Sequence, residues 1–176
     1  MIQELHTQRL LLRKMTASDS QKLFTIWSDP EVTKFMNISN FTSEHQAKEM
    51  IELLDELSQV NQAIRFSMIE LKSNELVGTC GFNSIDLDND KAEIGYDIAK
   101  AFWGMGYAPE GIRALIDYAF ENLKLNRIEA KVEPENMNSI RVLQKLHFTF
   151  EGTLRQYEKS KGKYIDINMY SLLKTD

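Results

Sequence analysis

The residues most able to perform chemistry lie in a short glycine-containing stretch, Trp103-Gly104-Met105-Gly106, between an alternating segment and a helical one. Glycine tolerates positive φ and lets backbone N–H groups approach an anion closely. Pro109 follows three residues after the second glycine, and its fixed φ and missing N–H suit the first turn of a helix. The N-terminus of a helix offers N–H groups that have no intrahelical acceptor. A strand, a glycine loop and a helix start in this order predict a phosphate-binding site.

Two common phosphate-binding motifs are excluded by the residues around this loop. A dinucleotide-binding fingerprint needs a third glycine three residues after the second, but Pro109 occupies that position. It also needs a strand–helix–strand unit early in the fold, whereas several antiparallel strands are expected to precede this loop. The sequence contains no GxxxxGK[ST] motif, so a P-loop is excluded as well.

Other residue types that commonly carry catalysis indicate neither a metal site nor a reactive thiol. The three histidines, His6, His45 and His147, are scattered, and there is no HExxH motif and no cysteine pair. We therefore expect no bound metal. The single cysteine, Cys80, lies in a glycine-flanked strand, where a buried structural thiol is favoured over a nucleophile.

The loop must be positioned by the elements on either side of it. Ile94, Tyr96 and Ile98 alternate with polar or small residues, which predicts a half-buried strand that ends at Ile98. We interpret Ile94 and Tyr96 as core residues of this strand. From Ala108 to Leu123 apolar residues recur at helical spacing, which predicts a helix with one apolar stripe.

The same patterns divide the rest of the chain into alternating strands and helices. We expect strands over 5–15, 63–71, 75–85, 127–133, 148–154 and 164–173, and helices over 16–28, over 43–60 and after a cap at Asn138 or Ser139. The order is βααβββαβαββ, which predicts an α+β (mixed α/β) fold built on one sheet. With no linker or repeat visible, residues 1–176 are expected to form a single domain.

Composition limits the class of protein. The 176 residues are 43% hydrophobic and 27% charged, as in an ordinary soluble globular domain. There is no apolar run long enough to span a membrane, and the first residues lack the basic and apolar regions of a signal peptide. One cysteine fits a reducing cytosol, so we expect a cytoplasmic protein. A formal charge of −5 argues against general affinity for nucleic acid and is compatible with a cationic substrate.

Three segments together resemble a known family. They are AEIGYDIAKAFWGMGYAPEGIRALIDYAF from residue 92, NRIEAKVEPENMNSIRVLQKLHF from residue 126 and EGTLRQYEKSKGKYIDINMYSLL from residue 151. They resemble the GNAT superfamily of N-acetyltransferases, and within it the bacterial ribosomal-protein N-terminal (alanine or serine) acetyltransferases. The similarity covers nearly the whole chain. It implies a central, mostly antiparallel sheet with one splayed pair of parallel strands, flanked by helices.

The resemblance implies that the phosphate is the pyrophosphate of acetyl-CoA. Gly104 and Gly106 fill the glycine positions of the family's phosphate loop, while Ala101 replaces the usual Arg or Gln. By resemblance, the Ile98 N–H or its neighbour's would polarise the thioester carbonyl. Asn136 would contact the pantetheine arm, although capping a helix is an alternative role for it. The residues expected at acetyl-CoA are Ile98, Trp103, Gly104, Met105, Gly106, Tyr107, Ala108 and Asn136, with the backbone amides of residues 105–108 cradling the pyrophosphate.

The resemblance also implies two catalytic residues, Ser139 and Glu158. Many members carry a Tyr seven residues after the Asn that corresponds to Asn136, and this Tyr acts as the general acid. In this sequence that position is Leu143. Ser139 is therefore the expected partner of the leaving thiolate. Glu158 matches a Glu proposed as general base in the same branch, and a solvent-facing hairpin carboxylate is an equally consistent interpretation. His147 replaces a glycine usual before the next strand and is expected to serve a left-handed turn rather than catalysis.

These residues predict direct attack of an amine on acetyl-CoA within a ternary complex. No covalent acyl-enzyme is expected, because no activated Cys or Ser is visible. The preferred acceptor is a protein N-terminal α-amine, plausibly of a ribosomal protein. A small-molecule amine (polyamine, amino acid or aminoglycoside) and a non-catalytic acetyl-CoA-binding module are the alternatives. We expect no nucleic-acid or membrane partner, and the oligomeric state is open, with a homodimer among the options.

Overall fold

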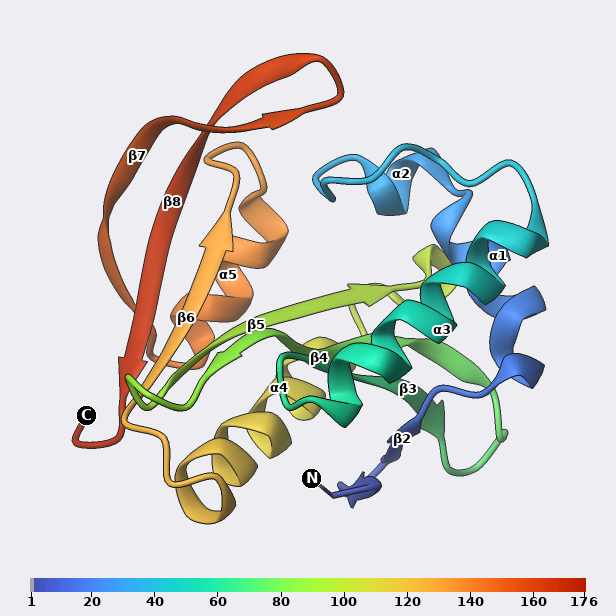
Figure 1. Ribbon diagram of the computed structural model, residues 1–176, viewed down its shortest axis with the longest axis horizontal. Helices are drawn as coiled ribbons and strands as arrows, with labels where there is room; N and C mark the ends of the chain where they lie inside the picture. The colour runs from blue at the N-terminus through green and yellow to red at the C-terminus, as the bar shows by residue number, and fades with distance from the viewer. Residues whose placement is uncertain (1) are drawn as a thin grey trace.

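An eight-stranded sheet organises the chain in the computed structural model, which describes residues 2–176 (Figure 1). The strand order is β1-β2-β3-β4-β5-β6-β8-β7, and of the strand pairs in the described residues only β5 with β6 is parallel. The strands are β1 Glu4–His6, β2 Leu10–Lys14, β3 Ile64–Glu70, β4 Leu76–Asp86, β5 Lys91–Ile98, β6 Arg127–Val132, β7 Thr149–Ser160 and β8 Lys163–Leu173. The predicted α+β fold with a mostly antiparallel sheet is confirmed.

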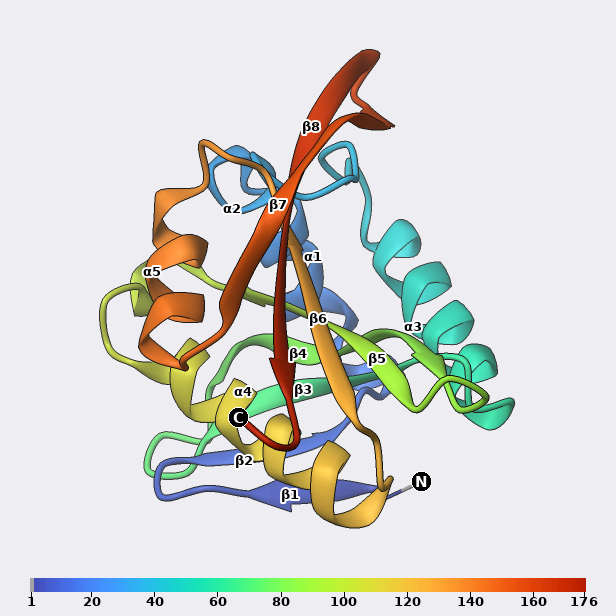
Figure 2. The same cartoon turned by 90° about the vertical axis from the view of Figure 1, so that its left-hand side faces the viewer.

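The helices lie on the two sides of this sheet in separate groups (Figures 1 and 2). Along the chain they are α1 Ser20–Trp27, α2 Pro30–Thr33, α3 Glu44–Gln59, α4 Tyr107–Asp117 and α5 Met137–Lys145. The last turn of α4 continues as a π-helix over Tyr118–Asn122. Over residues 2–176, every helix is too short or too polar to cross a membrane.

Each face of the sheet has its own apolar core, because side chains alternate along a strand. On β2, Leu10 and Leu12 are fully buried in a cluster that also holds Ile112 of α4. Between them, Leu11 packs on the opposite face against a cluster that includes Trp27 of α1. The sheet therefore separates a side covered by α4 and α5 from a side covered by α1 and α3.

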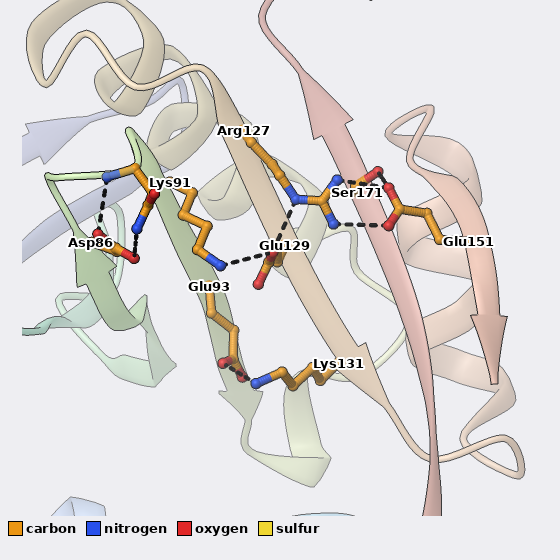
Figure 3. A network of polar contacts seen from close by, with 9 residues as sticks. Asp86, Lys91, Glu93, Arg127, Glu129, Lys131, Glu151 and Ser171 are labelled. Carbon is orange, nitrogen blue, oxygen red and sulfur yellow. Dashed lines mark hydrogen bonds and ion pairs between the residues drawn. The ribbon is translucent and has the colours of Figure 1, made fainter. Parts of the chain in front are cut away.

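The parallel pair β5 and β6 stays together for only three residues. Lys91–Glu93 pair with Arg127–Glu129, and beyond these positions the two strands diverge (Figure 1). Two ion pairs link β5 and β6 near this opening (Figure 3): Lys131 Nζ lies 3.1 Å from Glu93 Oε2, and Lys91 Nζ lies 3.6 Å from Glu129 Oε1. On the other side of β6, Arg127 reaches across β8 to Glu151 at 2.7 Å. The predicted splayed strand pair is present, and ion pairs link the two strands close to the point where they diverge.

The first predicted strand, over 5–15, is wrong in one respect. Two strands occupy it, β1 and β2, joined by a tight turn in which Thr7 N donates to Leu10 O at 2.9 Å. The Thr7 hydroxyl also accepts a hydrogen bond from Leu10 N at 2.9 Å. A run of four polar residues from His6 to Arg9 interrupts the apolar pattern at the turn, and this interruption was the available signal for the reversal.

Two predicted boundaries near the C-terminus also differ from the structure. Helix α5 is capped by Asn136, whose Oδ1 accepts from Ser139 N at 3.3 Å, rather than by Asn138 or Ser139. Strand β7 continues to Ser160 instead of ending at 154, because it pairs with β8 as far as Ser160 and Lys163. The residues of β7 beyond 154 are mostly exposed, so no apolar alternation marked them as a strand.

Candidate functional site

A cleft of about 1210 Å³ opens where β5 and β6 diverge. Its walls come from β5, β6, the starts of α4 and α5, the end of β7 and the segment around α2. Of the predicted site residues, those that line it are Ile98, Trp103, Gly104, Gly106, Tyr107, Ala108, Asn136, Ser139 and Glu158. Met105 is not among the lining residues, and its side chain is half exposed. Residues from several distant segments are thus brought to one cavity.

The glycine loop has the backbone conformation that its sequence predicts. Gly104 and Gly106 have φ of 75° and 80°, values that residues with a Cβ rarely adopt. Gly106 is the N-cap of α4 and provides no side chain to satisfy the first N–H groups of that helix. At the other end of the loop, the Trp103 indole N–H donates to Ile98 O at 2.7 Å and ties the loop to the end of β5. The loop presents free N–H groups at a helix start, as an anion site requires.

The end of β5 has backbone groups without a strand partner on one side. Ala99 N donates to Val77 O of β4 at 2.9 Å, so the backbone groups of Ala99 face β4. Because these groups alternate along a strand, the N–H groups of Ile98 and Tyr96 face the other side. Pairing with β6 has already ended at Glu93 on that side, so these N–H groups point into the cleft opening.

Ser139 meets a second hydroxyl that the sequence analysis did not assign to the site. Ser139 Oγ lies 2.7 Å from Tyr96 Oη, across the opening between β5 and α5. Both residues line the cleft. Tyr96 was interpreted as a core residue, but its hydroxyl serves this polar pair. The available signal was its position two residues before Ile98, which places both side chains on the same face of the strand.

The environment of Tyr96 keeps its hydroxyl protonated. Burial raises the pKa of Tyr96, and this effect outweighs the hydrogen bond with Ser139, which lowers it. A neutral phenol retains a proton that it can donate to the serine oxygen while the serine donates onward. With the phenol as donor to the serine oxygen, the Ser139 hydroxyl hydrogen is free to point into the cleft.

Two carboxylates line the cleft near its β6–β7 side, Glu158 on β7 and Glu133 just after β6. Burial raises the pKa of Glu133, the negative charges of Glu135 and Glu158 raise it further, and the positive charge of Lys161 opposes them. Glu133 was not predicted as a site residue. Its position directly after a strand, at the edge where β6 leaves β5, could have indicated it.

A buried ionic network lies under the part of the cleft near α1. Asp97 Oδ2 accepts from Arg65 Nη2 at 3.0 Å, from Thr79 Oγ1 at 2.7 Å and from Trp27 Nε1 at 3.3 Å. The side chains of Arg65 and Asp97 are only 12% and 2% exposed. These contacts join β3, β4, β5 and α1 directly beside Ile98, so they fix the end of β5 in place.

The segment around α2 is held over the cleft from two directions. Lys161, at the tip of the β7–β8 hairpin, donates from Nζ to Thr33 O at 2.6 Å. Glu31 forms an ion pair with Lys100, which lies just before the glycine loop. Figure 1 shows the hairpin reaching over toward α2. These contacts place the α2 segment along the wall of the cleft opposite the start of α5.

The remaining reactive residue types take structural roles. Cys80 is buried, and burial raises the pKa of its thiol to about 12, so the nucleophilic thiolate is not formed near neutral pH. His147 has φ of 66°, which confirms the predicted left-handed turn. Within the described chain, no group of three or more His, Cys, Asp or Glu residues is arranged to hold a metal ion.

Comparison with known proteins agrees with this geometry. The acetyltransferase (GNAT) domain family matches residues 9–149. An "uncharacterized N-acetyltransferase p20" of Bacillus licheniformis is 54% identical over 99% of this chain and 98% of its own length. The ribosomal-protein-serine acetyltransferase of Escherichia coli is 34% identical over 57% of this chain and 56% of its own length. Among solved structures, RimL, a ribosomal L7/L12 α-N-protein acetyltransferase in complex with coenzyme A, has a TM-score of 0.86 and 27% identity, covering 95% of each chain.

Proposed function

The chain belongs to the acetyltransferase (GNAT) family, and from this premise we propose that it moves the acetyl group of acetyl-CoA to the N-terminal α-amine of a protein, with a ribosomal protein as acceptor. The observation that supports acetyl-CoA as the acetyl donor is the cleft itself. It joins the Gly104–Gly106 loop, the unpaired N–H of Ile98 and the Ser139 hydroxyl in one cavity. The acceptor half is supported by the ribosomal-protein acetyltransferases among the relatives and solved structures.

In this proposal the loop and the start of α4 bind the pyrophosphate through backbone N–H groups. The unpaired edge of β5 receives the pantetheine arm, and Asn136 lies beside its path. The Ile98 N–H donates to the thioester oxygen, where negative charge develops as the amine attacks. One C–N bond forms, the C–S bond breaks, and the coenzyme leaves as a thiolate.

The Ser139 hydroxyl is placed to donate its proton to this thiolate, with Tyr96 replacing the proton on Ser139 and water in the open cleft returning a proton to Tyr96. The Tyr96–Ser139 pair thus acts as the general acid, a role that the apolar side chain of Leu143 cannot fill. The proton lost by the amine goes through water to Glu158, as expected from the sequence, or to Glu133 beside it. Because burial and neighbouring charges raise the pKa of Glu133, we propose Glu133 as the acceptor of the proton and Glu158 as the charge that supports it.

An α-amine suits such a weak base. Its pKa of about 7.7–8.0 leaves roughly a tenth of the groups neutral at pH 7, whereas a lysine amine near 10.4 is neutral in about a thousandth or less. This difference in deprotonation is worth about 3 kcal/mol in favour of the N-terminus. We propose that the reaction takes place in the cytoplasm, because the single cysteine is kept as a buried thiol.

The test follows thiol release from acetyl-CoA with a panel of acceptors. The panel contains peptides with free N-termini, the same peptides with blocked α-amines, lysine peptides, polyamines and aminoglycosides. Turnover that depends on a free α-amine supports the proposal. Turnover confined to polyamines or aminoglycosides would assign a small-molecule acceptor instead. Coenzyme binding without turnover of any acceptor would indicate a non-catalytic module.

A further inference from the structure

The turn between β1 and β2 contacts the glycine loop although the two are about a hundred residues apart in the chain. Arg9, in this turn, donates from Nη1 to Met105 O at 2.8 Å. Its guanidinium lies over the Tyr107 ring, 4.5 Å from the ring centre. A side-chain carbon placed on Gly106 would lie 3.3 Å from Arg9 Nη2. One arginine thus touches three consecutive residues of the predicted pyrophosphate site.

A glutamate on α4 holds Arg9 in this position. Glu110 Oε1 accepts from Arg9 Nε at 2.8 Å, and Glu110 Oε2 accepts from the backbone N of Arg9 at 2.9 Å. The Thr7 hydroxyl donates to the same carboxylate at 2.5 Å. Burial raises the pKa of Glu110, but the hydrogen bonds from Thr7 and Arg9 and the charge of Arg9 lower it more, so the carboxylate stays ionised. The turn and the first turn of α4 are therefore joined by four polar contacts, which include the bond to Met105.

The contact to Met105 determines which way the loop presents its donors. In a planar trans peptide, the carbonyl oxygen and the N–H of the following residue point in opposite directions. Arg9 holds Met105 O on its own side, so the Gly106 N–H must point to the other side. Gly106 lines the cleft and Arg9 does not, so that other side is the cleft. Within residues 2–176 the Gly106 N–H has no acceptor outside the helices and strands.

Among the described residues, the loop side chain that makes a hydrogen bond is Trp103, which anchors the start of the loop to Ile98 O ahead of both glycines and not at the Met105–Gly106 peptide. Ala101, in the turn just before it, carries no polar group, and both glycines have no side chain at all. With φ of 75° and 80°, the two glycines would allow several backbone arrangements in the absence of an external contact. Arg9 is the external contact that the structure provides.

We propose that Arg9 is a positioning residue for the donor: from behind the loop it orients the Gly106 N–H, and the loop amides with it, toward the pyrophosphate of acetyl-CoA. This inference rests on the proposed donor. It concerns the diphosphate part of the coenzyme alone, because Arg9 lies outside the cleft and its contacts are with the loop and the start of α4, not with Ile98 or Ser139.

The experiment measures binding of CoA and of pantetheine, which lacks the pyrophosphate and the nucleotide, by calorimetry in the absence of any acceptor. For Arg9→Ala we expect the Kd of CoA to rise about 10- to 100-fold, the effect of losing a charged hydrogen bond that organises the site. The Kd of pantetheine should change by less than about twofold. Arg9→Lys keeps the charge but not the planar fork, so it should give an intermediate loss for CoA only.

Arg113→Ala is the matched control, an exposed arginine on α4 without a hydrogen bond or ion pair to other described residues. It should bind both ligands as the wild type does. If Arg9→Ala and Arg9→Lys raised the Kd of CoA and the Kd of pantetheine equally, or left the Kd of CoA unchanged, the positioning role would be overturned. A wild-type protein that bound CoA no more tightly than pantetheine would overturn the proposed donor, and this inference with it.

Discussion

The hydrogen bond between Tyr96 and Ser139 leads to a quantitative prediction for catalysis. Tyr96→Phe removes one oxygen and keeps the ring that packs against the core. If the hydroxyl only supported the resting geometry, losing a neutral hydrogen bond would cost about 0.5–1.5 kcal/mol. If it supports Ser139 as the thiolate forms, the bond acquires a charged partner and is worth about 1.5–3 kcal/mol. At about 1.4 kcal/mol per factor of ten in rate, the second case lowers kcat by about 10- to 100-fold.

We therefore expect Tyr96→Phe to lower kcat about 10- to 100-fold while the KM for acetyl-CoA stays within about twofold. Thiol release with a saturating peptide acceptor measures both constants. Since burial raises the pKa of Tyr96, its ionisation should not appear in the pH profile below the ordinary range of tyrosine. The variant should keep the shape of the wild-type profile and differ only in height. Tyr164→Phe is the matched control, because the Tyr164 side chain is 68% exposed at the hairpin tip and should leave kcat unchanged.

A double-mutant cycle with Ser139→Ala tests whether the two hydroxyls act as one unit. If Tyr96 acts through Ser139, the double variant should be no slower than Ser139→Ala alone. Independent, multiplying losses in kcat would refute the relay. A tenfold or larger rise in the KM for acetyl-CoA in Tyr96→Phe, with kcat unchanged, would make Tyr96 a binding residue instead.

The remaining predictions concern four carboxylates. Asp97→Ala should lower the free energy of unfolding by about 3–5 kcal/mol, because it leaves the largely buried Arg65 charge without its carboxylate and removes the acceptor of Thr79 and Trp27. Urea denaturation measures this, and a variant as stable as the wild type would contradict the role of the network. Glu133→Gln should remove the acidic limb from the pH dependence of kcat/KM, whereas Glu158→Gln should move that limb to lower pH, because the Glu158 charge raises the pKa of Glu133. Loss of the limb in Glu158→Gln alone would assign the base to Glu158. Hydrogen bonds from its arginine and serine partners lower the pKa of Glu151 from 4.5 to about 2, so its stabilising contribution is complete above pH 4.5 and is lost as the pH falls toward about 2. The Glu151 side chain is 37% exposed, so this contribution is below about 1 kcal/mol, and the difference in Tm between wild type and Glu151→Gln should shrink over that pH range. A difference that stays constant from pH 5 to pH 2 would disagree with this assignment.

Much of the fold could be predicted because its signals are local. The capping boxes at Thr16 and Ser43 mark the starts of their helical segments in the structure as they do in the sequence. Strands with one apolar face were placed to within a few residues. The misplaced segments were the β1–β2 turn, where a run of four polar residues was included in one strand, and the far half of β7, which is exposed and has no apolar face.

The parts of the candidate site that depend on local contacts could also be predicted, and those that depend on contacts between distant segments could not. The sequence by itself determined the glycine loop, because positive φ at Gly104 and Gly106 and a helix start at the next residue depend only on neighbouring residues. It also placed Asn136 and Ser139 at the start of one helix. Only the tertiary structure decided that Tyr96 reaches Ser139, 43 residues away, and that Arg9 reaches Met105, 96 residues away. Those contacts depend on where β5 leaves β6 and on how the β1–β2 turn lies against α4. Such arrangements are set by strand register and packing across the sheet, and no pattern within a single segment contains them.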